Sequence, residues 1–413
     1  MSVNGISFKN ENKIGKTVFP NDWSIYILND ILKLVKRPLK MEEQHVYNLV
    51  TVKRRFGGMV DRGMLRGDQI EVKSQFFIQS GDFVISKRQI SHGACAIVPE
   101  GLHGSIVSNE YNVLRNKEEL DLEFFNWYVQ LPFMQRNFYL SSDGVHIEKL
   151  LFKLEDWLRR KVCIPDVNEQ VRIAKIISTW EKAIDLKERL IEEKKEQKKG
   201  LMQKLLTGDL RLPGFKKEWN YFKIKEVCNV VSGGTPSTND GKNWGGNIPW
   251  CTPSDITSSG KYIQNTKKSI TDKGLKKSSA NLLPKNSILM CSRATIGPRC
   301  INKVEMATNQ GFKSFICKKE HLDYEFFHYL LSIYIPYFKK LASGSTFLEI
   351  SKRDVENTKV FIPQDINEQV AISSIIGNMD NAIELLEEET RALRQQKKGL
   401  MQLLLTGKVR VKA

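Results

Sequence analysis

The sequence predicts an α+β fold in which two mixed α/β domains are separated by two long antiparallel coiled-coil helices. A segment at residues 162–212 returns at 360–413 with a closely similar sequence. This repeated segment has the apolar spacing of a long helix, and the stretches outside it carry strand and turn signals. The chain therefore consists of two duplicated halves, which we expect to be related by a pseudo-twofold axis.

The repeat keeps a constant interval along the chain. The Asn-Glu-Gln triplet at 168–170 returns 199 residues later at 367–369, and Lys-Lys-Gly-Leu-Met-Gln at 198–203 returns at 397–402 by the same interval. Solenoid repeats are much shorter, about 20–50 residues. A segment without insertions or deletions over this span is one whose length matters to the fold.

Both copies predict an amphipathic helix. Apolar residues alternate steps of three and four, which is the 3.5-residue period of a coiled coil. Lys187, Lys194 and Lys198 interrupt the first stripe. A helix of about 39 residues would be about 58 Å long. The predicted stripe consists of Ile173, Ile177, Trp180, Ile184, Ile191, Leu201, Leu205, Ile372, Ile376, Met379, Ile383, Leu386, Leu393, Leu400 and Leu404.

The ends of these helices also have sequence signals. Asp166 with Glu169, and Asp365 with Glu368, have the spacing of a capping box, and a glycine follows each helix as a natural stop. Two separate core helices are the alternative. The matched length and register favour two helices that pack on each other and form a spacer.

Composition and charge favour a polyanionic partner. Lys and Arg outnumber Asp and Glu by 64 to 47, which gives a formal net charge of +17. Nucleic acid fits this surplus better than an acidic membrane, although a basic protein without a nucleic-acid role is the alternative.

The seven cysteines contain no Cys-x-x-Cys pair, which is typical of reduced thiols in the cytoplasm. We find no signal peptide and expect no membrane span.

The predicted segments are 1–161, 162–212, 213–359 and 360–413. The first and third are globular modules that share landmarks, such as Asp-Leu-Glu-Phe-Phe at 121–125 and Asp-Tyr-Glu-Phe-Phe at 323–327, but diverge elsewhere. Strands are expected early in each module and helices late. A shared skeleton with different surfaces indicates two modules that recognise two different targets. The clearest strand patterns lie at 76–78, 82–86 and 287–291.

Enzyme motifs are missing or weak. The stretch 233–242 suggests a phosphate loop, but Pro236 and Asn243 stand where glycine and Ser or Thr are required. The Asn/Asp-Pro-Pro-Tyr/Phe motif of amino-methyltransferases is absent, and the six histidines show no metal-ligand spacing. We therefore expect no catalytic residue and no metal ligand. A faint nuclease-like set fits a solvated strand face better: Asp61, Asp68, Glu71 and Lys73.

Polar and basic loop residues predict a recognition surface instead. Arg, Asn and Gln can read base edges, whereas Lys mostly contacts phosphate. A solvated surface side chain is the alternative for each single residue. Trp244 and Trp250 could stack on bases or pack in the core. The candidates in the first module are Lys53, Arg54, Arg55, Lys87, Arg88, Gln89, Asn109 and Tyr111. Those in the second are Ser232, Gly233, Gly234, Thr235, Thr252, Ser254, Asp255, Arg293, Thr295, Asn309, Gln310 and Lys313.

The chain contains two divergent modules, and each is followed by a helix with the same motifs: Ile-Pro, Asn-Glu-Gln, Lys-Lys-Gly-Leu-Met-Gln and Leu-Leu-Thr-Gly. This arrangement resembles the DNA-specificity subunit of type I restriction-modification systems. The Ser-Gly-Gly-Thr-Pro-Ser run at 232–237 and Thr-Asn-Gln at 308–310 also resemble parts of that family's target-recognition domains. The resemblance implies that 1–161 and 213–359 are target-recognition domains. It implies that 162–212 and 360–413 are the conserved spacer helices.

The resemblance further implies a non-catalytic subunit that binds double-stranded DNA. Each domain would read one half of a bipartite target, and the coiled coil would set the gap. Two modification subunits would bind S-adenosylmethionine and methylate adenine, and restriction subunits that depend on ATP and Mg would cleave. No cofactor is expected on this chain. A self-contained restriction or methylation enzyme and a protein-only coiled-coil scaffold are the alternatives. Methyl transfer by the purified chain would favour the enzyme, and the lack of sequence-dependent DNA affinity would favour the scaffold.

Overall fold

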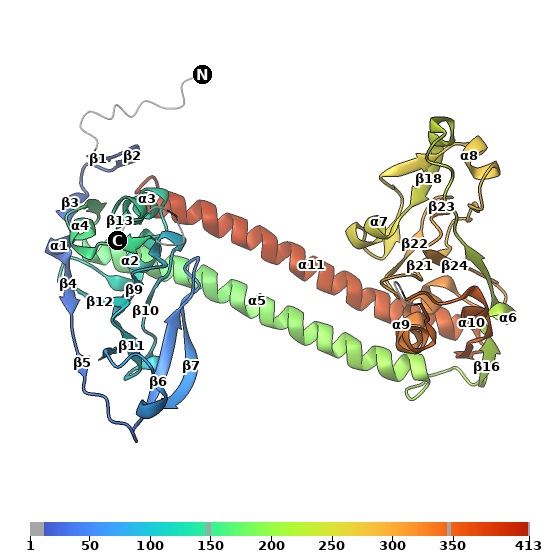
Figure 1. The fold of residues 1–413 in the computed structure, drawn as a ribbon, viewed down its shortest axis with the longest axis horizontal. Coiled ribbons are helices and arrows are strands. Elements are labelled where there is room, and N and C mark those ends of the chain that lie inside the picture. The colour runs from blue at the N-terminus through green and yellow to red at the C-terminus, as the bar shows by residue number, and fades with distance from the viewer. Residues whose placement is uncertain (1–11, 145, 147–149, 345–347, 412–413) are drawn as a thin grey trace. The chain divides into compact units, whose positions relative to one another are not determined.

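The computed structural model describes residues 12–144, 146, 150–344 and 348–411 (Figure 1). The chain divides into two compact units. Unit 1 comprises Met1–Glu188 and Glu389–Ala413, and unit 2 comprises Arg189–Glu388. Each unit contains one α/β module together with a part of each of the two long helices, which are α5 (Val167–Thr207) and α11 (Ile366–Leu405).

Unit 1 contains a four-stranded sheet, a five-stranded sheet and short helices. The four-stranded sheet has the order β10 (Cys95–Ile97), β9 (Phe83–Ser86), β12 (Tyr111–Asn116), β4 (Leu32–Val35). The five-stranded sheet has the order β5 (Pro38–Leu39), β8 (Gln75–Phe77), β11 (Ile106–Ser108), β6 (Val46–Val52), β7 (Met59–Arg66). Three two-stranded pairs are β1 (Asn12–Ile14) with β2 (Thr17–Phe19), β3 (Ser24–Ile27) with β15 (Lys161–Ile164), and β13 (Ser142–Asp143) with β14 (Leu151–Phe152). The helices are α1 (Leu28–Ile31), α2 (Leu122–Tyr128), α3 (Pro132–Leu140) and α4 (Leu154–Leu158).

Unit 2 contains a five-stranded sheet, a three-stranded sheet and five helices of its own module among the described residues. The five-stranded sheet has the order β17 (Cys228–Ser232), β24 (Phe312–Cys317), β21 (Ile288–Cys291), β22 (Arg299–Asn302), β19 (Tyr262–Ile263). The three-stranded sheet has the order β20 (Lys268–Ile270), β18 (Trp244–Cys251), β23 (Ala307–Thr308). β16 (Trp219–Lys223) pairs with β25 (Lys359–Pro363). The helices are α6 (Ile224–Val227), α7 (Pro253–Ser258), α8 (Asp272–Lys276), α9 (Tyr324–Leu341) and α10 (Lys352–Asn357).

The two modules share one frame. The order β4-β12-β9-β10 in unit 1 corresponds to β17-β24-β21-β22 in unit 2, and the pair β3-β15 corresponds to β16-β25. The second sheets differ, because one has five strands and the other has three. The sequence predicts this combination of a common skeleton with divergent surfaces. The strands that it predicts near 76–78, 82–86 and 287–291 are β8, β9 and β21.

The Asn-Glu-Gln triplet joins each long helix to its module. Gln170 is fully buried, accepts a hydrogen bond from the Asp121 backbone N–H at 2.9 Å and donates to the Pro165 carbonyl at 2.8 Å. Gln369 repeats this arrangement with Asp323 at 2.8 Å and with a proline carbonyl. Asp121 and Asp323 in turn cap the aromatic helices α2 and α9. The repeated glutamine therefore fixes the start of the long helix against the end of the module.

The glutamate of the same triplet does not complete a capping box. Asp166 caps α5 by accepting from the Glu169 N–H at 3.0 Å, but the Glu169 carboxylate pairs with Arg410 at 2.7 Å. Glu368 pairs likewise with Arg211, also at 2.7 Å. Each arginine follows the end of the other long helix, so the ion pair joins the start of one helix to the end of the other within a unit. The capping-box prediction was half wrong, because a guanidinium distant in the sequence provides a stronger partner than a backbone N–H.

The two long helices pack antiparallel within each unit. In unit 1, Ile173 and Ile177 share a core with Leu404, and the C-terminal end of α11 lies beside the start of α5 (Figure 1). In unit 2, Leu205 shares a core with Ile372 and its neighbours. Every residue of the predicted stripe is buried or half-buried. The coiled-coil prediction is therefore confirmed, and the two helices contact each other through the predicted faces.

The lysines that interrupt the stripe have partners on the facing helix. Lys187 pairs with Glu389 at 2.5 Å in unit 1, and Lys198 pairs with Asp380 in unit 2. Both helices end at a glycine, as predicted. Gly208 has a φ of +79° and Gly407 a φ of +69°, which is the left-handed conformation of a helix C-cap. Within the described part of the chain, no helix is long and apolar enough to cross a membrane.

Candidate nucleic-acid interface

A strained turn displays the first basic cluster of unit 1. Lys53, Arg54 and Arg55 are exposed in the turn between β6 and β7. Arg55 and Phe56 have φ values of +58° and +55°, a conformation that side chains other than glycine rarely adopt. Their backbone N–H groups donate to the carbonyls of His92 at 2.6 Å and of residue 93 at 2.9 Å. These hydrogen bonds hold the turn in place, and strain of this kind is found mostly at functional sites.

The second and third clusters of unit 1 meet at the paired ends of β9 and β12. Lys87 donates to the Asn109 carbonyl at 2.5 Å, and Arg88 pairs with Glu110 at 2.7 Å. The Tyr111 hydroxyl lies 3.3 Å from the Thr51 hydroxyl at the end of β6. The predicted residues of the first module therefore lie around one end of its two sheets. Gln89 is half-buried beside them.

A cavity of about 330 Å³ lies beside the strained turn. Arg54, Arg55, Phe56, Ser91 and Gln135 are among the residues that line it. The Ser91 hydroxyl is buried and has no hydrogen-bond partner among the described residues. Ser91 and Gln135 were not predicted from the sequence, because no local pattern places either residue near the turn at 53–56. Unsatisfied buried polar groups are costly in a free protein, so they mark a place where a polar partner fits.

In unit 2 two glycines allow the predicted loops to pack closely. A Cβ atom on Gly233 would lie 1.9 Å from the Asn309 carbonyl oxygen, and one on Gly234 would lie 2.3 Å from the Ala280 nitrogen. The Gly234 N–H also donates to the Thr308 carbonyl at 2.9 Å. These glycines are therefore required for packing, and they bring the loop after β17 against the loop after β23. Thr235 contacts Gln310 through a side-chain hydrogen bond at this junction.

The loop after β21 is the second strained element. Ala294 has a φ of +60° between the exposed residues Arg293 and Thr295. Its N–H donates to the Leu348 carbonyl at 2.9 Å, and the N–H of residue 292 donates to the carbonyl of residue 311 at 2.8 Å. The Asn309 side chain accepts from the N–H of residue 311 at 2.9 Å. The predicted loops at 232–235, 292–295 and 308–310 are thus held together.

Two predicted residues of unit 2 lie below this surface. Asp255 is 4% exposed, and its carboxylate accepts from the backbone N–H groups of Thr252 at 2.9 Å and Lys267 at 3.0 Å. Burial opposes ionisation, but hydrogen bonds from the Thr252 hydroxyl and from these two N–H groups outweigh it and lower the pKa of Asp255. Lys313 is 5% exposed and pairs with Glu349 at 3.1 Å. We assign Asp255 and Lys313 to the support of the loops, whereas Thr252 and Ser254 remain accessible beside them.

The two tryptophans of unit 2 pack against each other. Trp250 is 5% exposed, and its ring centroid lies 4.9 Å from that of Trp244 in an edge-to-face arrangement. Trp250 Nε1 donates to the Gly234 carbonyl at 2.9 Å, so it buttresses the loop from below. Trp244 is half-buried, and Lys268 lies 5.7 Å from its ring centroid. Core packing is therefore the role of Trp250.

The weak enzyme signals have ordinary structural surroundings. Asp61 accepts the N–H of residue 63 at 2.7 Å, Asp68 pairs with Arg66, and Lys73 donates to the carbonyl of residue 67 at 2.7 Å. These are the local contacts of a solvated hairpin. Among the described residues, no group of three or more His, Cys, Asp or Glu side chains could hold a metal ion.

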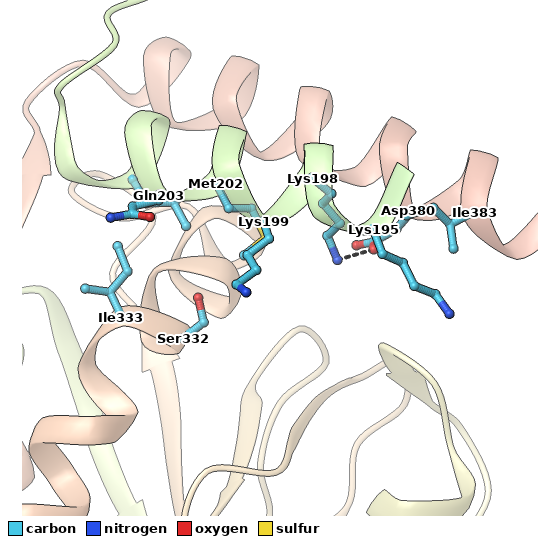
Figure 2. Close-up of a pocket in the computed structure, with 10 residues that line it drawn as sticks. Lys195, Lys198, Lys199, Met202, Gln203, Ser332, Ile333, Asp380 and Ile383 are labelled. Atoms are coloured by element: carbon cyan, nitrogen blue, oxygen red, sulfur yellow. Dashed lines mark ion pairs between the residues drawn. The ribbon is translucent and has the colours of Figure 1, made fainter. Parts of the chain in front are cut away.

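The long helices form one groove with the module in each unit. Groove 2, in unit 2, has a volume of about 470 Å³, and Lys199, Met202 and Gln203 project from α5 toward the stretch of α9 that carries Ser332 and Ile333 (Figure 2). Groove 1, in unit 1, has a volume of about 380 Å³. The wall of groove 2 from α5 is Lys195, Lys198, Lys199, Met202, Gln203 and Leu206. The wall of groove 1 from α11 is Arg394, Lys397, Lys398, Met401, Gln402 and Leu405.

These two walls correspond residue by residue, since each member of the second follows its counterpart by 199 positions. The ion pairs beside them correspond too, because Lys198 pairs with Asp380 and Lys397 pairs with Glu181. The module side of the grooves differs, with Ser332 and Ile333 in unit 2 and residues such as Trp127 in unit 1. The structure therefore presents one apolar and basic surface twice.

The fold and these surfaces define a protein with two recognition modules that share one arrangement of strands and helices. Each module is followed by a long helix, and the two helices have similar sequences. The family model described as the type I restriction modification DNA specificity domain matches residues 20–195 and again 216–395. The chain belongs to this family and is a specificity subunit with two target-recognition domains.

Relatives agree with this assignment, and solved structures match the fold. The chain is 35% identical to the type I restriction enzyme MjaIX specificity subunit of Methanocaldococcus jannaschii over 43% of its own length and 42% of that protein's. It is 25% identical to the putative type I restriction enzyme MjaX specificity subunit of the same organism, over 98% of this chain and 99% of that one. The crystal structure of the HsdS subunit from Thermoanaerobacter tengcongensis matches the fold with a TM-score of 0.56 at 17% identity, covering 96% of this chain and 99% of that one. The S subunit of a type I system from M. genitalium matches with a TM-score of 0.57 at 16% identity, covering 95% and 98%.

Proposed function

We propose that the two target-recognition domains read the two halves of a bipartite double-stranded DNA target, one half each. The observation that carries this proposal is the clustering of predicted contact residues around one strained loop in each module. The strained loops lie at different places, between β6 and β7 in unit 1 and after β21 in unit 2, so the two modules would read unlike sequences through unlike loops. The net charge of +17 would add attraction for phosphate that depends on salt.

A module exchange tests this proposal. The segment 12–161 is replaced by the corresponding segment of another specificity subunit, and the altered chain is expressed with its partner subunits in a cell that lacks other adenine methylation. We expect methylome sequencing to show a changed first half-site, an unchanged second half-site and an unchanged gap. The reciprocal exchange of 213–359 is the matched control. A change in both halves from one exchange would contradict the proposal.

We also propose that the long helices set the gap between the half-sites. α5 and α11 run without interruption through the residues at which the two units divide, 188–189 and 388–389. Ion pairs such as Lys187 with Glu389 and Lys195 with Glu387, at 2.5 and 2.9 Å, hold the register of the two helices on each side of that division. A helix with a fixed register has a fixed length per residue, which suits a spacer.

We propose that groove 1 and groove 2 are the docking sites of two identical modification subunits. The repeated walls support this, because two copies of one partner need two copies of one surface. Met202 and Met401 supply adaptable apolar contact, and the flanking lysines favour an acidic rim on the partner. The modification subunits would bind S-adenosylmethionine and methylate adenine. Restriction subunits would use ATP and Mg to cleave, and this chain would work in the cytoplasm without catalysing a step itself.

A further inference from the structure

Unit 2 contains a second cavity beside groove 2, and the two share Lys198, Met202, Asp380 and Ile383. It has a volume of about 740 Å³, which lies within the usual range of about 300–1,000 Å³ for small-molecule sites. It lies where α5, α9 and α11 meet β22, and none of the predicted DNA-contact residues lines it. The residues that matter to its chemistry are Lys198, Lys261, Arg299, His328, Tyr329 and Gly377.

Arg299 is a largely buried cation without a carboxylate partner. Its Nε donates to the His328 carbonyl at 2.7 Å, and another guanidinium nitrogen donates to the carbonyl of residue 297 at 3.3 Å. Both acceptors are neutral, and no ion pair to Arg299 is found in the described part of the chain. Burial lowers the pKa of Arg299 to about 10. Buried guanidinium groups are normally paired with an anion, so this one lacks its usual counter-charge.

His328 is a buried imidazole next to Arg299. Its side chain is 8% exposed, and the buried Nδ1 has no hydrogen-bond partner among the described residues. Burial, and then the positive charges of Arg299, Lys261 and Lys198, lower the pKa of His328 well below its ordinary value. The imidazole is therefore neutral. Of the three cations beside it, Lys198 pairs with Asp380 and Lys261 with Glu325, so Arg299 is the one without a carboxylate partner among the described residues.

Three carboxylates line the cavity, those of Asp380, Glu384 and Glu387, and among the described residues none of them pairs with Arg299. Asp380 pairs with Lys198 and accepts from the Tyr329 hydroxyl at 2.7 Å. Glu387 pairs with Lys195 at 2.9 Å. The carboxylates lining the cavity therefore leave Arg299 uncompensated.

Gly377 lines the cavity, and its counterpart in the other long helix carries a side chain. A glycine inside a helix lowers stability by about 1 kcal/mol relative to alanine, so its presence in the middle of α11 needs a reason. The counterpart of Gly377 in α5 is Ser178, which accepts a hydrogen bond from Trp127 Nε1 at 3.4 Å. Trp127 occupies the position that corresponds to Tyr329. The two units therefore differ in the side chains at this place, although their long helices are repeated.

We propose that this cavity binds a small oxyanion ligand, a phosphate or a carboxylate, with Arg299 as its charge partner. Such a ligand would give Arg299 the counter-charge that it lacks. A small ligand fits better than DNA, because the predicted DNA loops lie on other elements. This inference does not depend on the proposed function.

Calorimetric titration of the full-length chain at constant ionic strength tests the proposal, with inorganic phosphate, pyrophosphate and glutamate as probes. We expect at least one probe to bind. We expect Arg299→Gln to weaken its binding at least tenfold and Arg299→Lys to restore most of the affinity. Arg353→Gln, an equal change of charge at an exposed position of α10, is the matched control and should bind like the wild type.

Gly377→Gln is a second variant, since it fills the cavity while favouring the helix, and it should also lose binding.

The phosphate and glutamate titrations separate the two ligand chemistries. The proposal is overturned if no probe binds the wild type, or if Arg299→Gln binds the probes as well as the wild type does. It is also overturned if Arg299→Gln weakens the affinity for duplex DNA as much as that for the probe, because the cavity would then belong to the DNA surface.

Discussion

Arg55, Phe56 and Ala294 adopt the left-handed backbone conformation although none of them is a glycine. They are three of the four described non-glycine residues with a positive φ, and the fourth is Asn286, a residue type that tolerates it. Arg55 and Ala294 lie in loops that the sequence predicts to contact DNA. Strain of this kind persists only where the surrounding structure holds it, so it supports a functional role for both loops.

The replacement Arg55→Gly separates the side chain's role from the backbone's. Glycine adopts a φ of +58° without strain, so the thermal stability should be maintained or raised. The lost guanidinium should reduce discrimination at one base pair of the first half-site by about 1–3 kcal/mol. Competition binding with single-base variants of the target measures this. Arg293→Ala should produce the same effect in the second half-site only, and a loss of discrimination in the wrong half would contradict the assignment.

The pH dependence of stability should reveal the neutral His328. Its pKa is lowered in the folded state by burial and by Arg299, Lys261 and Lys198, and the ordinary value is about 6.5. The unfolded chain therefore binds more protons, and stability that is present above pH 6.5 is lost as the pH falls toward the lowered folded value. We expect the melting temperature of the wild type to fall more between pH 7 and pH 5 than that of His328→Asn. Asparagine is the residue at the corresponding position of unit 1, Asn126.

Single-residue roles were the hardest to predict from the sequence. Residue type and local pattern identified the exposed candidates Arg88, Arg293 and Gln310. They could not show that Asp255 and Lys313 are buried, because their partners Lys267 and Glu349 lie outside any local pattern. Burial depends on tertiary packing, and a loop sequence carries little information about it.

At the scale of elements, the Asn-Glu-Gln triplet has a structural role that its repetition explains. Its glutamine attaches the long helix to the aromatic helix of the module, and its glutamate binds an arginine after the other long helix. A segment that must make both contacts in each unit cannot change in length or register.

Replacing the glutamate of this triplet should destabilise the unit that contains it. Glu169 is 2% exposed and pairs through both oxygens with Arg410. This hydrogen bonding is the main cause that raises the pKa of Arg410. Because Arg410 is partly exposed, we expect Glu169→Gln to lower the free energy of unfolding by about 1–3 kcal/mol. Glu368→Gln should act similarly through Arg211. Urea denaturation measures both variants, and no change in either would contradict the role of the pair.

The repeated grooves lead to a paired prediction. Lys199→Glu should weaken docking of a modification subunit at groove 2, and Lys398→Glu should do the same at groove 1. Each single variant should retain one tightly bound modification subunit, and the double variant should retain none. Native mass spectrometry of the purified complexes counts the subunits. Glu193→Lys, at an exposed position of α5 that lines neither groove, is a control that should keep both.

The long helices were predictable because their apolar period, caps and glycine stops are local signals. The sheets were predictable only in part. The strands β8, β9 and β21 have clear patterns, but the order β4-β12-β9-β10 depends on pairings between distant residues such as Val113 and Val35. The sequence predicts that the two modules share a skeleton, but the correspondence strand by strand became visible only in the structure.

At the scale of the whole molecule, the duplication explains how one chain can recognise two unlike sequences. The frame, the Asn-Glu-Gln contacts and the groove walls occur twice, whereas the second sheets and the loops differ. Repeated parts suit tasks that are done twice in the same way, such as docking a partner. Divergent parts suit tasks that differ between the halves, such as reading bases.

The measurement that tests the central claim most directly is the methylome of a chain with lengthened helices. One heptad is inserted after Glu188 in α5 and one after Glu388 in α11, so that the antiparallel helices stay in register. Seven residues add about 10 Å, which corresponds to about three base pairs of B-DNA. We expect both half-sites to stay unchanged while the gap between them grows. An unchanged gap, or altered bases in either half-site, would contradict the claim that the helices set the distance between two independent readers.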